Sequence, residues 1–358
     1  MSRKLASIVR IRETRPIKDA DRIEIAVMED KAWQCVTGKG EFRPGDLAVY
    51  FEVDSFLPKK DPYLFLEGRC NKKMLNEEGY RLKTIKLRGE LSQGMLISPD
   101  KFPELEDLPA GTDVTEILGI RLYEAPVPAC LAGEVKGAFP GFLSKSDQER
   151  LQNLPDYFER MKGVEFEITL KMDGSSMTAY AYKFPDTSRR ATGICSRNLE
   201  LKRPEEDSVK INTFWGIAGH LDLERRMKKL FRNIAIQGEV CGEGIQSNRC
   251  GIRGQNLFVY DIFDIDTHSY LPQPERLRLM KTLNHMDDVM IEHVPVFCFC
   301  RIFNRFGSFD EIHDWVAEQP GYNGTMCEGA VFKSVQPVNG RVVSFKVINN
   351  NYLLKYGG

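Results

Sequence analysis

The feature that most constrains the fold is a succession of short apolar segments within the first 121 residues. Glycine, proline and aspartate separate these segments, which is typical of strands joined by tight turns. The segments read ASIVRIRETR, RIEIAVME, AWQCVTG, DLAVYFEV, RLKTIKLRG and GMLISPD. So many short strands with little helical periodicity predict an all-β barrel over 1–121.

The rest of the chain, 122–358, has a different pattern and is expected to form a second domain. Residues 122–142 contain several prolines and glycines and are expected to connect the two domains. Residues 144–161 show a helical pattern broken by Pro155. Strands dominate afterwards, and helices are expected at 220–233, 272–286 and 308–318. The combination predicts an α+β second domain.

Composition narrows the class of protein. Hydrophobic residues make up 42% and charged residues 28% of the chain, as in globular proteins. No apolar run approaches the roughly 18 residues of a membrane span, and the basic N-terminus lacks the apolar block of a signal peptide. The net charge of −1 gives no global attraction to nucleic acid, so any such binding must depend on local patches.

The nine cysteines form no CxxC pair, so neither a zinc site nor a disulfide framework is expected. Cys298 and Cys300 lie in the apolar run VFCFC and are interpreted as core thiols. A reducing, cytoplasmic compartment is the simplest setting for such a chain.

The sequence FEITLKMDGSS contains the most informative short motif. Alternating apolar residues in 166–170 predict a strand with one buried face. Lys171 continues the polar face, Asp173 follows on the same side, and Gly174 permits a turn. Lys171 is therefore either an ordinary solvent-exposed residue or a nucleophile at the mouth of a pocket.

Five further motifs follow in order, and they make coincidence implausible. They are CSRN (195–198), IQGEVCGEGIQSN (236–248), LFVYDIF (257–263), CEGAVFK (327–333) and VVSFKVIN (342–349). The series resembles the nucleotidyltransferase motifs of covalent lysine ligases and capping enzymes, over residues 145–355. This resemblance implies an antiparallel-sheet nucleotidyltransferase (ATP-grasp-like ligase) domain with flanking helices.

Transfer of a nucleotide to lysine requires an uncharged amine, although a free lysine is largely protonated at neutral pH. Nearby cations and a bound metal can lower the pKa of Lys171 and activate it. Lys346 is expected to supply one such cation and to stabilise charge on the α-phosphate. The expected ligands of a hydrated Mg²⁺ or Mn²⁺ are Asp173, Glu239 and Glu328.

The resemblance assigns further residues to the nucleotide, with ATP as the implied cosubstrate. Glu239 looks like the carboxylate that reads the ribose, and Phe258, preferred over Tyr260, looks like the ring that stacks on adenine. Arg197 resembles a phosphate contact. The remaining candidates for nucleotide binding are Arg150, Gln152, Asn153 and Lys333. Lys333 has an odd spacing from Glu328, which in a regular strand would point the two side chains to opposite faces.

The first domain looks like the OB-type barrel of tRNA-binding modules. The segments that carry this resemblance are DADRIEIAVM, GKGEFRPGDLAVYFEVDSFLP and IKLRGELSQGMLIS. Such barrels bind nucleic acid with one strand face and its loops. Basic residues available for RNA contact are Arg3, Lys4, Arg10, Arg12, Arg15, Lys83, Lys86 and Arg88, with acidic residues mixed among them.

The order of the domains resembles the fifth family of ATP-dependent RNA ligases, because an OB module precedes the ligase domain. Only twelve residues follow Lys346, whereas DNA ligases and capping enzymes carry an OB domain there. The last motif departs from many RNA ligases in having Ser344 where they have a lysine.

The implied reaction seals nicks in duplex RNA or RNA–DNA hybrids in RNA repair, and no membrane or protein partner is implied. A GTP-using capping guanylyltransferase and a non-catalytic RNA-binding protein remain alternatives.

Overall fold

The computed structural model describes residues 3–75, 77–124, 133–184, 190–205 and 211–356. The chain divides into two compact units. We call them the barrel unit, which comprises Met1–Val127, Leu151–Asp156 and Asn350–Gly358, and the two-sheet unit, which comprises Pro128–Arg150 and Tyr157–Asn349. The barrel unit therefore includes two segments beyond the expected boundary at residue 121.

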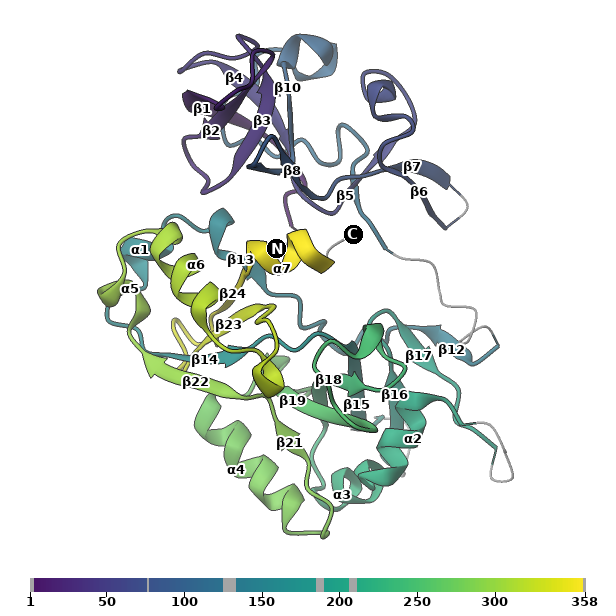
Figure 1. Cartoon of the computed structure of the whole chain (residues 1–358). Helices are drawn as coiled ribbons and strands as arrows, with labels where there is room; N and C mark the ends of the chain where they lie inside the picture. Colours follow the sequence, from purple (N-terminus) through teal and green to yellow (C-terminus); the bar gives the residue numbers. More distant parts are fainter. Residues whose placement is uncertain (1–2, 76, 125–132, 185–189, 206–210, 357–358) are drawn as a thin grey trace. The chain divides into compact units, whose positions relative to one another are not determined.

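The barrel unit is a near-closed antiparallel barrel, as predicted (Figure 1). One sheet has the order β10-β4-β1-β2-β3, a second has the order β11-β5-β7-β6, and β8 and β9 form a hairpin. Their bounds are β1 Ala6–Pro16, β2 Ile23–Met28, β3 Gln34–Gly38, β4 Leu47–Phe51, β5 Ser55–Pro58, β6 Asn71–Met74, β7 Glu77–Arg81, β8 Thr84–Leu87, β9 Glu90–Gln93, β10 Met95–Ile97 and β11 Arg121–Leu122. The last helix, α7 (Asn350–Tyr356), also belongs to this unit, where Asn350 Oδ1 accepts a hydrogen bond from Gln93 at 3.0 Å.

The two-sheet unit is built on two mainly antiparallel sheets. The larger has the order β12-β17-β16-β15-β18-β19-β20, with β21 beside β19, and the smaller has the order β13-β24-β23-β14-β22. The bounds in the larger sheet are β12 Val135–Ala138, β15 Ser175–Lys183, β16 Arg190–Cys195, β17 Leu199–Leu201, β18 Ile234–Gly242, β19 Gln255–Asp264, β20 Ser269–Tyr270 and β21 Glu292–His293. Those in the smaller sheet are β13 Glu149–Arg150, β14 Phe166–Leu170, β22 Val296–Cys300, β23 Gly329–Ser334 and β24 Ser344–Ile348.

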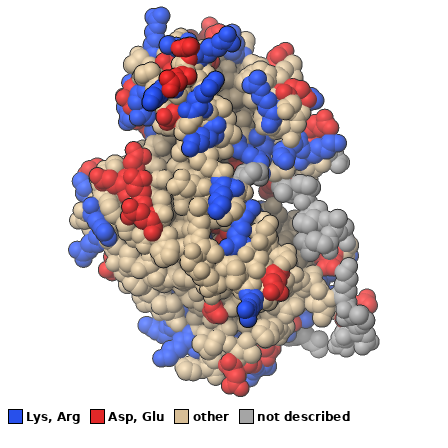
Figure 2. Space-filling model, in the orientation of Figure 1, with Lys and Arg blue, Asp and Glu red and all other residues tan. Residues whose placement is uncertain are grey.

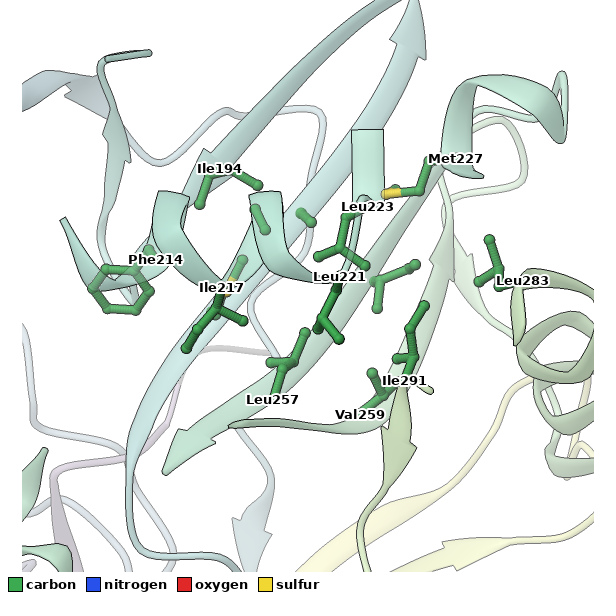
Figure 3. Close-up of a cluster of buried hydrophobic side chains, with 14 of the residues drawn as sticks. Ile194, Phe214, Ile217, Leu221, Leu223, Met227, Leu257, Val259, Leu283 and Ile291 are labelled. Carbon is green, nitrogen blue, oxygen red and sulfur yellow. The ribbon is translucent and has the colours of Figure 1, made fainter. Parts of the chain in front are cut away.

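Helices α2 (Thr213–His220) and α3 (Leu223–Lys229) pack on the larger sheet. Their apolar side chains meet Ile194, Leu257 and Val259 from the strands in one buried cluster (Figure 3). The other α-helices of this unit are α1 Tyr157–Arg160, α4 Gln273–Asn284, α5 Ile302–Arg305 and α6 Phe309–Glu318. The helices expected at 220–233, 272–286 and 308–318 thus correspond to α3, α4 and α6.

The helix expected over 144–161 is mostly absent. Residues Glu149–Arg150 are extended instead, because they pair in parallel with β24, with Arg150 opposite Lys346. A 3₁₀ turn at Leu151–Asn153 and the short helix α1, beyond Pro155, are the helical parts of this stretch. Pairing with a distant strand overrides the local periodicity here.

Strand β14 differs from the expected half-buried strand, because all five of its residues are buried. Glu167, on the expected polar face, is completely buried and forms an ion pair with the buried Arg276 of α4. Cys298 and Cys300 are only half-buried, since β22 is an edge strand, so they are not core thiols. Among the described residues, no helix is both long and apolar enough to cross a membrane.

Candidate active site

Lys171 lies where the chain passes from the smaller sheet to the larger one. It follows β14 directly, and β15 begins at Ser175 in the other sheet. Its backbone N–H donates to the carbonyl of Gly329 at 2.9 Å. Its Nζ donates to Glu328 Oε1 at 2.5 Å, and the two side chains are 29% and 15% exposed. The lysine is therefore held between the sheets and remains partly accessible.

Two more carboxylates complete the surroundings of Lys171. Glu239 lies on β18, opposite Ser176 of β15 in the strand register. Asp173 Oδ2 accepts a hydrogen bond from Arg249 Nη1 at 3.0 Å. The structure therefore brings together all three acids that the sequence predicted around the lysine.

The charges of this cluster shift its pKa values strongly. Burial alone would lower the pKa of Lys171, but the charges of Glu328, Glu239 and Asp173 outweigh it and raise that pKa. Burial raises the pKa of Glu239 to about 8, against the opposing charge of Lys171. Burial likewise raises the pKa of Glu328. The expected lowering of the Lys171 pKa by nearby cations together with a bound metal stays a prediction for the site with metal and nucleotide bound.

Gly174 is required because a side chain at this position would collide with its neighbours, not because the chain needs a turn there. A Cβ atom there would lie 2.3 Å from the carbonyl oxygen of Val240 and 2.6 Å from Cys241 Sγ. The Asp-Gly pair thus lets β15 start in direct contact with β18, which brings Glu239 next to Lys171.

Lys346 is near Glu328, as predicted. It lies on β24 opposite Val331 of β23, and its charge opposes the rise in the pKa of Glu328. Arg150 is opposite Lys346 in the parallel register and is buried. Two basic residues therefore flank this side of the cluster.

The structure favours Tyr260 over Phe258 as a ring that could contact a nucleotide. Phe258 is 1% exposed, packs edge-on against Tyr322 and belongs to an apolar cluster with Leu170. Tyr260 is only half-buried, and its hydroxyl lies 2.9 Å from Ser146 Oγ and 3.1 Å from Ser176 Oγ. Phe258 is thus a core residue in this conformation.

The remaining candidates are more dispersed. Arg197 is exposed and pairs with Asp147 at 2.9 Å, although its charge still acts on Glu239. Lys333 is buried, pairs with Asp261 at 2.8 Å and donates to the carbonyl of Tyr260 at 2.6 Å.

Gln152 and Asn153 belong to the barrel unit. Asn153 Oδ1 accepts a hydrogen bond from Trp33 Nε1 at 2.6 Å, and the carbonyl of Gln152 accepts one from Ala32 at 3.1 Å. Contact of these two side chains with a nucleotide stays a prediction.

A small cavity of about 40 Å³ lies at Lys333 within the two-sheet unit, and the Lys333 ammonium contacts the ring of Tyr260. Its other lining residues are mostly polar and include Ser344, the residue that departs from the expected motif. The full lining is Lys145, Ser146, Asp147, Gln148, Asp261, Tyr270, Lys333, Val342 and Ser344. This cavity is too small to hold a whole nucleotide, and none of the residues around Lys171 lines it.

Arg249 and Ser146 were not predicted from the sequence. Arg249 lies in an irregular loop between β18 and β19, where no periodicity indicates which way a side chain points. Ser146 lies in the segment that was expected to be helical. In the sequence, the only sign of such a role is that each of these two residues, one basic and one with a hydroxyl group, lies next to a motif.

The carboxylates do not form a ready-made metal site. Within the described residues, no group of three acidic, histidine or cysteine side chains is arranged to hold an ion directly. Glu328 Oε2 is nevertheless buried without a hydrogen-bond partner, and burial raises the pKa of Glu239 to about 8, which favours its protonated form. Both features fit a hydrated divalent cation that would replace the proton.

Comparisons with known proteins agree with this geometry. An OB-fold domain profile matches residues 5–99 and an RNA ligase profile matches residues 164–348. The solved structure of Naegleria gruberi RNA ligase with PPi is 40% identical, with a TM-score of 0.84 and 99% of each chain covered. A lysine-to-alanine mutant of that ligase with ATP and Mn gives 40% identity, a TM-score of 0.85 and 99% coverage of each chain. No curated protein matches the sequence.

Proposed function

The chain belongs to the RNA ligase family, and from this premise we propose that it seals 3′-hydroxyl/5′-phosphate nicks in duplex RNA or RNA–DNA hybrids, with ATP as cosubstrate. The observation that carries the proposal is the contact between Lys171 and Glu328 at the junction of two sheets, with Glu239 and Asp173 beside it. The similar Naegleria gruberi structures with ATP and Mn or with PPi support ATP as the nucleotide. RNA repair is the role we infer.

The first step forms a bond between Lys171 Nζ and the α-phosphorus of ATP, and the bond to the bridging oxygen breaks to release pyrophosphate. The amine must first lose a proton, and Glu328 Oε1 is the acceptor already in contact with it. The carboxyl pKa of Glu328 is raised, which makes it a better proton acceptor than an ordinary glutamate. The product is a lysyl–AMP phosphoramidate.

In the second step an oxygen of the RNA 5′-phosphate attacks the AMP phosphorus, and the P–N bond to Lys171 breaks. The departing amine takes up a proton, and the surrounding acids, which raise its pKa, favour this departure. In the third step the RNA 3′-hydroxyl attacks the 5′-phosphate and releases AMP.

A hydrated Mg²⁺ or Mn²⁺ would be held by Asp173, Glu239 and Glu328. When bound, such an ion neutralises phosphate charge and offsets the acids that keep Lys171 protonated. Arg249 positions Asp173 for this role through their hydrogen bond.

The nucleotide itself would bind beside Lys171 and Tyr260. Its ring is the candidate for stacking on the base, and the Ser146 and Ser176 hydroxyls hold that ring in place. Lys346 and Arg150 would face the phosphates, and Lys333 would act by holding the backbone of Tyr260.

The barrel unit would contact the RNA. Several of its predicted contact residues are paired with acids, such as Arg3 with Glu52 at 2.9 Å. Figure 2 shows the same mixing of basic and acidic residues on the face in view. Lys86 and Arg88 on the exposed β8–β9 hairpin are therefore better candidates for phosphate contact.

Transfer of label from α-labelled ATP to the protein tests the proposal. Lys171→Ala is expected to abolish the label, whereas Lys162→Ala, which removes an exposed lysine paired with Glu159, retains it. A labelled Lys171→Ala protein would refute the assignment. Nicks with RNA or DNA on either side of the break then show which strand must carry 2′-hydroxyls.

A further inference from the structure

Two thiols that the proposed reaction does not use lie against the peptide that joins Asp173 to Gly174. Cys250 Sγ is 3.7 Å from the carbonyl oxygen of Asp173. Cys241 Sγ lies so close to Gly174 that a Cβ atom there would come within 2.6 Å of it. The two thiols hydrogen-bond to each other.

From this arrangement we propose that Cys241 and Cys250 form a reversible disulfide that switches off nucleotide transfer to Lys171. The loss of nucleotide transfer rests on the proposed function, whereas formation of the disulfide does not depend on it. A third cysteine of the same apolar cluster, Cys327, has a different partner: its thiol donates to the carbonyl of Gly329 at 3.3 Å.

The backbone around the pair allows the bond to form. Cys241 is near the end of β18, whereas Cys250 lies in the loop that leads back to β19. Asn323 holds this loop by donating to the carbonyls of Cys250 and Gly251, at 3.3 and 3.1 Å. A disulfide needs the sulfurs to close from hydrogen-bonding distance to about 2.05 Å, which requires a small shift of the loop.

That shift would act directly on the site. Arg249 precedes Cys250 and holds Asp173 through its guanidinium. Pulling Cys250 toward Cys241 would therefore displace Arg249 and disturb the Asp173–Gly174 peptide that both sulfurs contact. Asp173 would lose the position from which it acts beside Lys171.

The chemistry requires a two-electron oxidant, and a peroxide is the class we propose. One thiol attacks the peroxide, the O–O bond breaks, and the products are a sulfenic acid and water. The second thiol then attacks the sulfenic sulfur, the S–S bond forms, and a second water leaves. Both cysteines are oxidised, the peroxide is reduced, and a thiol reductant reverses the reaction.

The test treats the full-length protein with hydrogen peroxide and measures two quantities. Mass spectrometry of unreduced peptides is expected to find Cys241 linked to Cys250. Labelling from α-labelled ATP is expected to fall at least tenfold and to recover with dithiothreitol. The variants Cys241→Ser and Cys250→Ser, each compared with its own untreated sample, are expected to resist this loss, whereas Cys298→Ser remains sensitive.

The proposal is overturned if peroxide produces no Cys241–Cys250 peptide in the wild-type protein. It is also overturned if the linked protein labels as well as the reduced one, or if both serine variants lose labelling as fully as the wild type. A wild-type protein that takes no label before treatment would contradict the proposed function instead, and the peptide map would still decide whether the pair oxidises.

Discussion

Lys171 Nζ donates to Glu328 Oε1 across 2.5 Å, which joins the proposed nucleophile to a carboxylate directly before the neighbouring strand β23. The sequence separates these residues by a long interval, and the backbone bond from Lys171 to Gly329 fixes their approach. Glu328 raises the pKa of Lys171, and in the proposed mechanism it is also the acceptor for the proton of that lysine.

Glu328→Gln is therefore expected to slow formation of the enzyme–AMP adduct by about 10²–10⁴-fold, the usual range for loss of a positioned acid–base group. The amide can still contact Lys171 but cannot take up its proton. Single-turnover labelling at saturating ATP measures the effect. The exposed Glu318 provides a control, because Glu318→Gln leaves the site untouched. A Glu328→Gln protein as fast as wild type would contradict the role.

Glu239 should make stability depend on pH. Because its pKa of about 8 in the folded chain lies above the ordinary value, the folded chain keeps a proton that the unfolded chain has lost. The stability that this proton provides falls as the pH rises from about 4.5 to 8. Glu239→Gln removes that dependence, so its melting temperature relative to wild type should rise by at least about 2 °C between pH 5 and pH 8.5. Parallel curves for the two proteins, measured without metal or nucleotide, would contradict the assignment.

Gly174→Ala is expected to destabilise the protein by about 1–3 kcal/mol, the usual cost of overpacking. It should also abolish labelling, because the added methyl would push β15 away from Val240. Urea denaturation and labelling measure the two effects. In the matched control, Gly216→Ala in α2, the added Cβ meets no neighbouring atom within 4 Å. If Gly174→Ala behaves like Gly216→Ala, the space argument is wrong.

Lys333 is expected to act as a positioning residue. Lys333→Met leaves Asp261 buried without its ion-pair partner, which typically costs about 3–5 kcal/mol. Adding Asp261→Asn should recover most of that loss in urea denaturation. Labelling at saturating ATP should recover only in part, since methionine cannot donate to the carbonyl of Tyr260 as Lys333 does. A double variant that is stable yet unable to take label would instead indicate direct contact with the nucleotide.

Much of this site could be predicted from local sequence. Lys171, Asp173, Glu239, Glu328 and Lys346 each lie in or beside a strand, so the order of the motifs along the chain was enough to identify them. The barrel strands were similarly visible, because turn residues separate them.

The predictions that were wrong concerned residues whose structure depends on contacts between segments distant in the sequence. Glu167 appeared solvent-facing until α4 supplied the buried Arg276, and residues 149–150 appeared helical until β24 offered a partner. Phe258 and Tyr260 lie on the same strand, and only packing distinguishes the buried ring from the half-buried one.

The most direct measurement is to locate AMP on the protein after incubation with ATP and a divalent metal ion. Peptide mass spectrometry should find a single adenylylated peptide, modified at Lys171 and lost after acid treatment that cleaves the P–N bond. An adduct on any other residue, or an unmodified Lys171 in a protein that still seals RNA, would contradict the account.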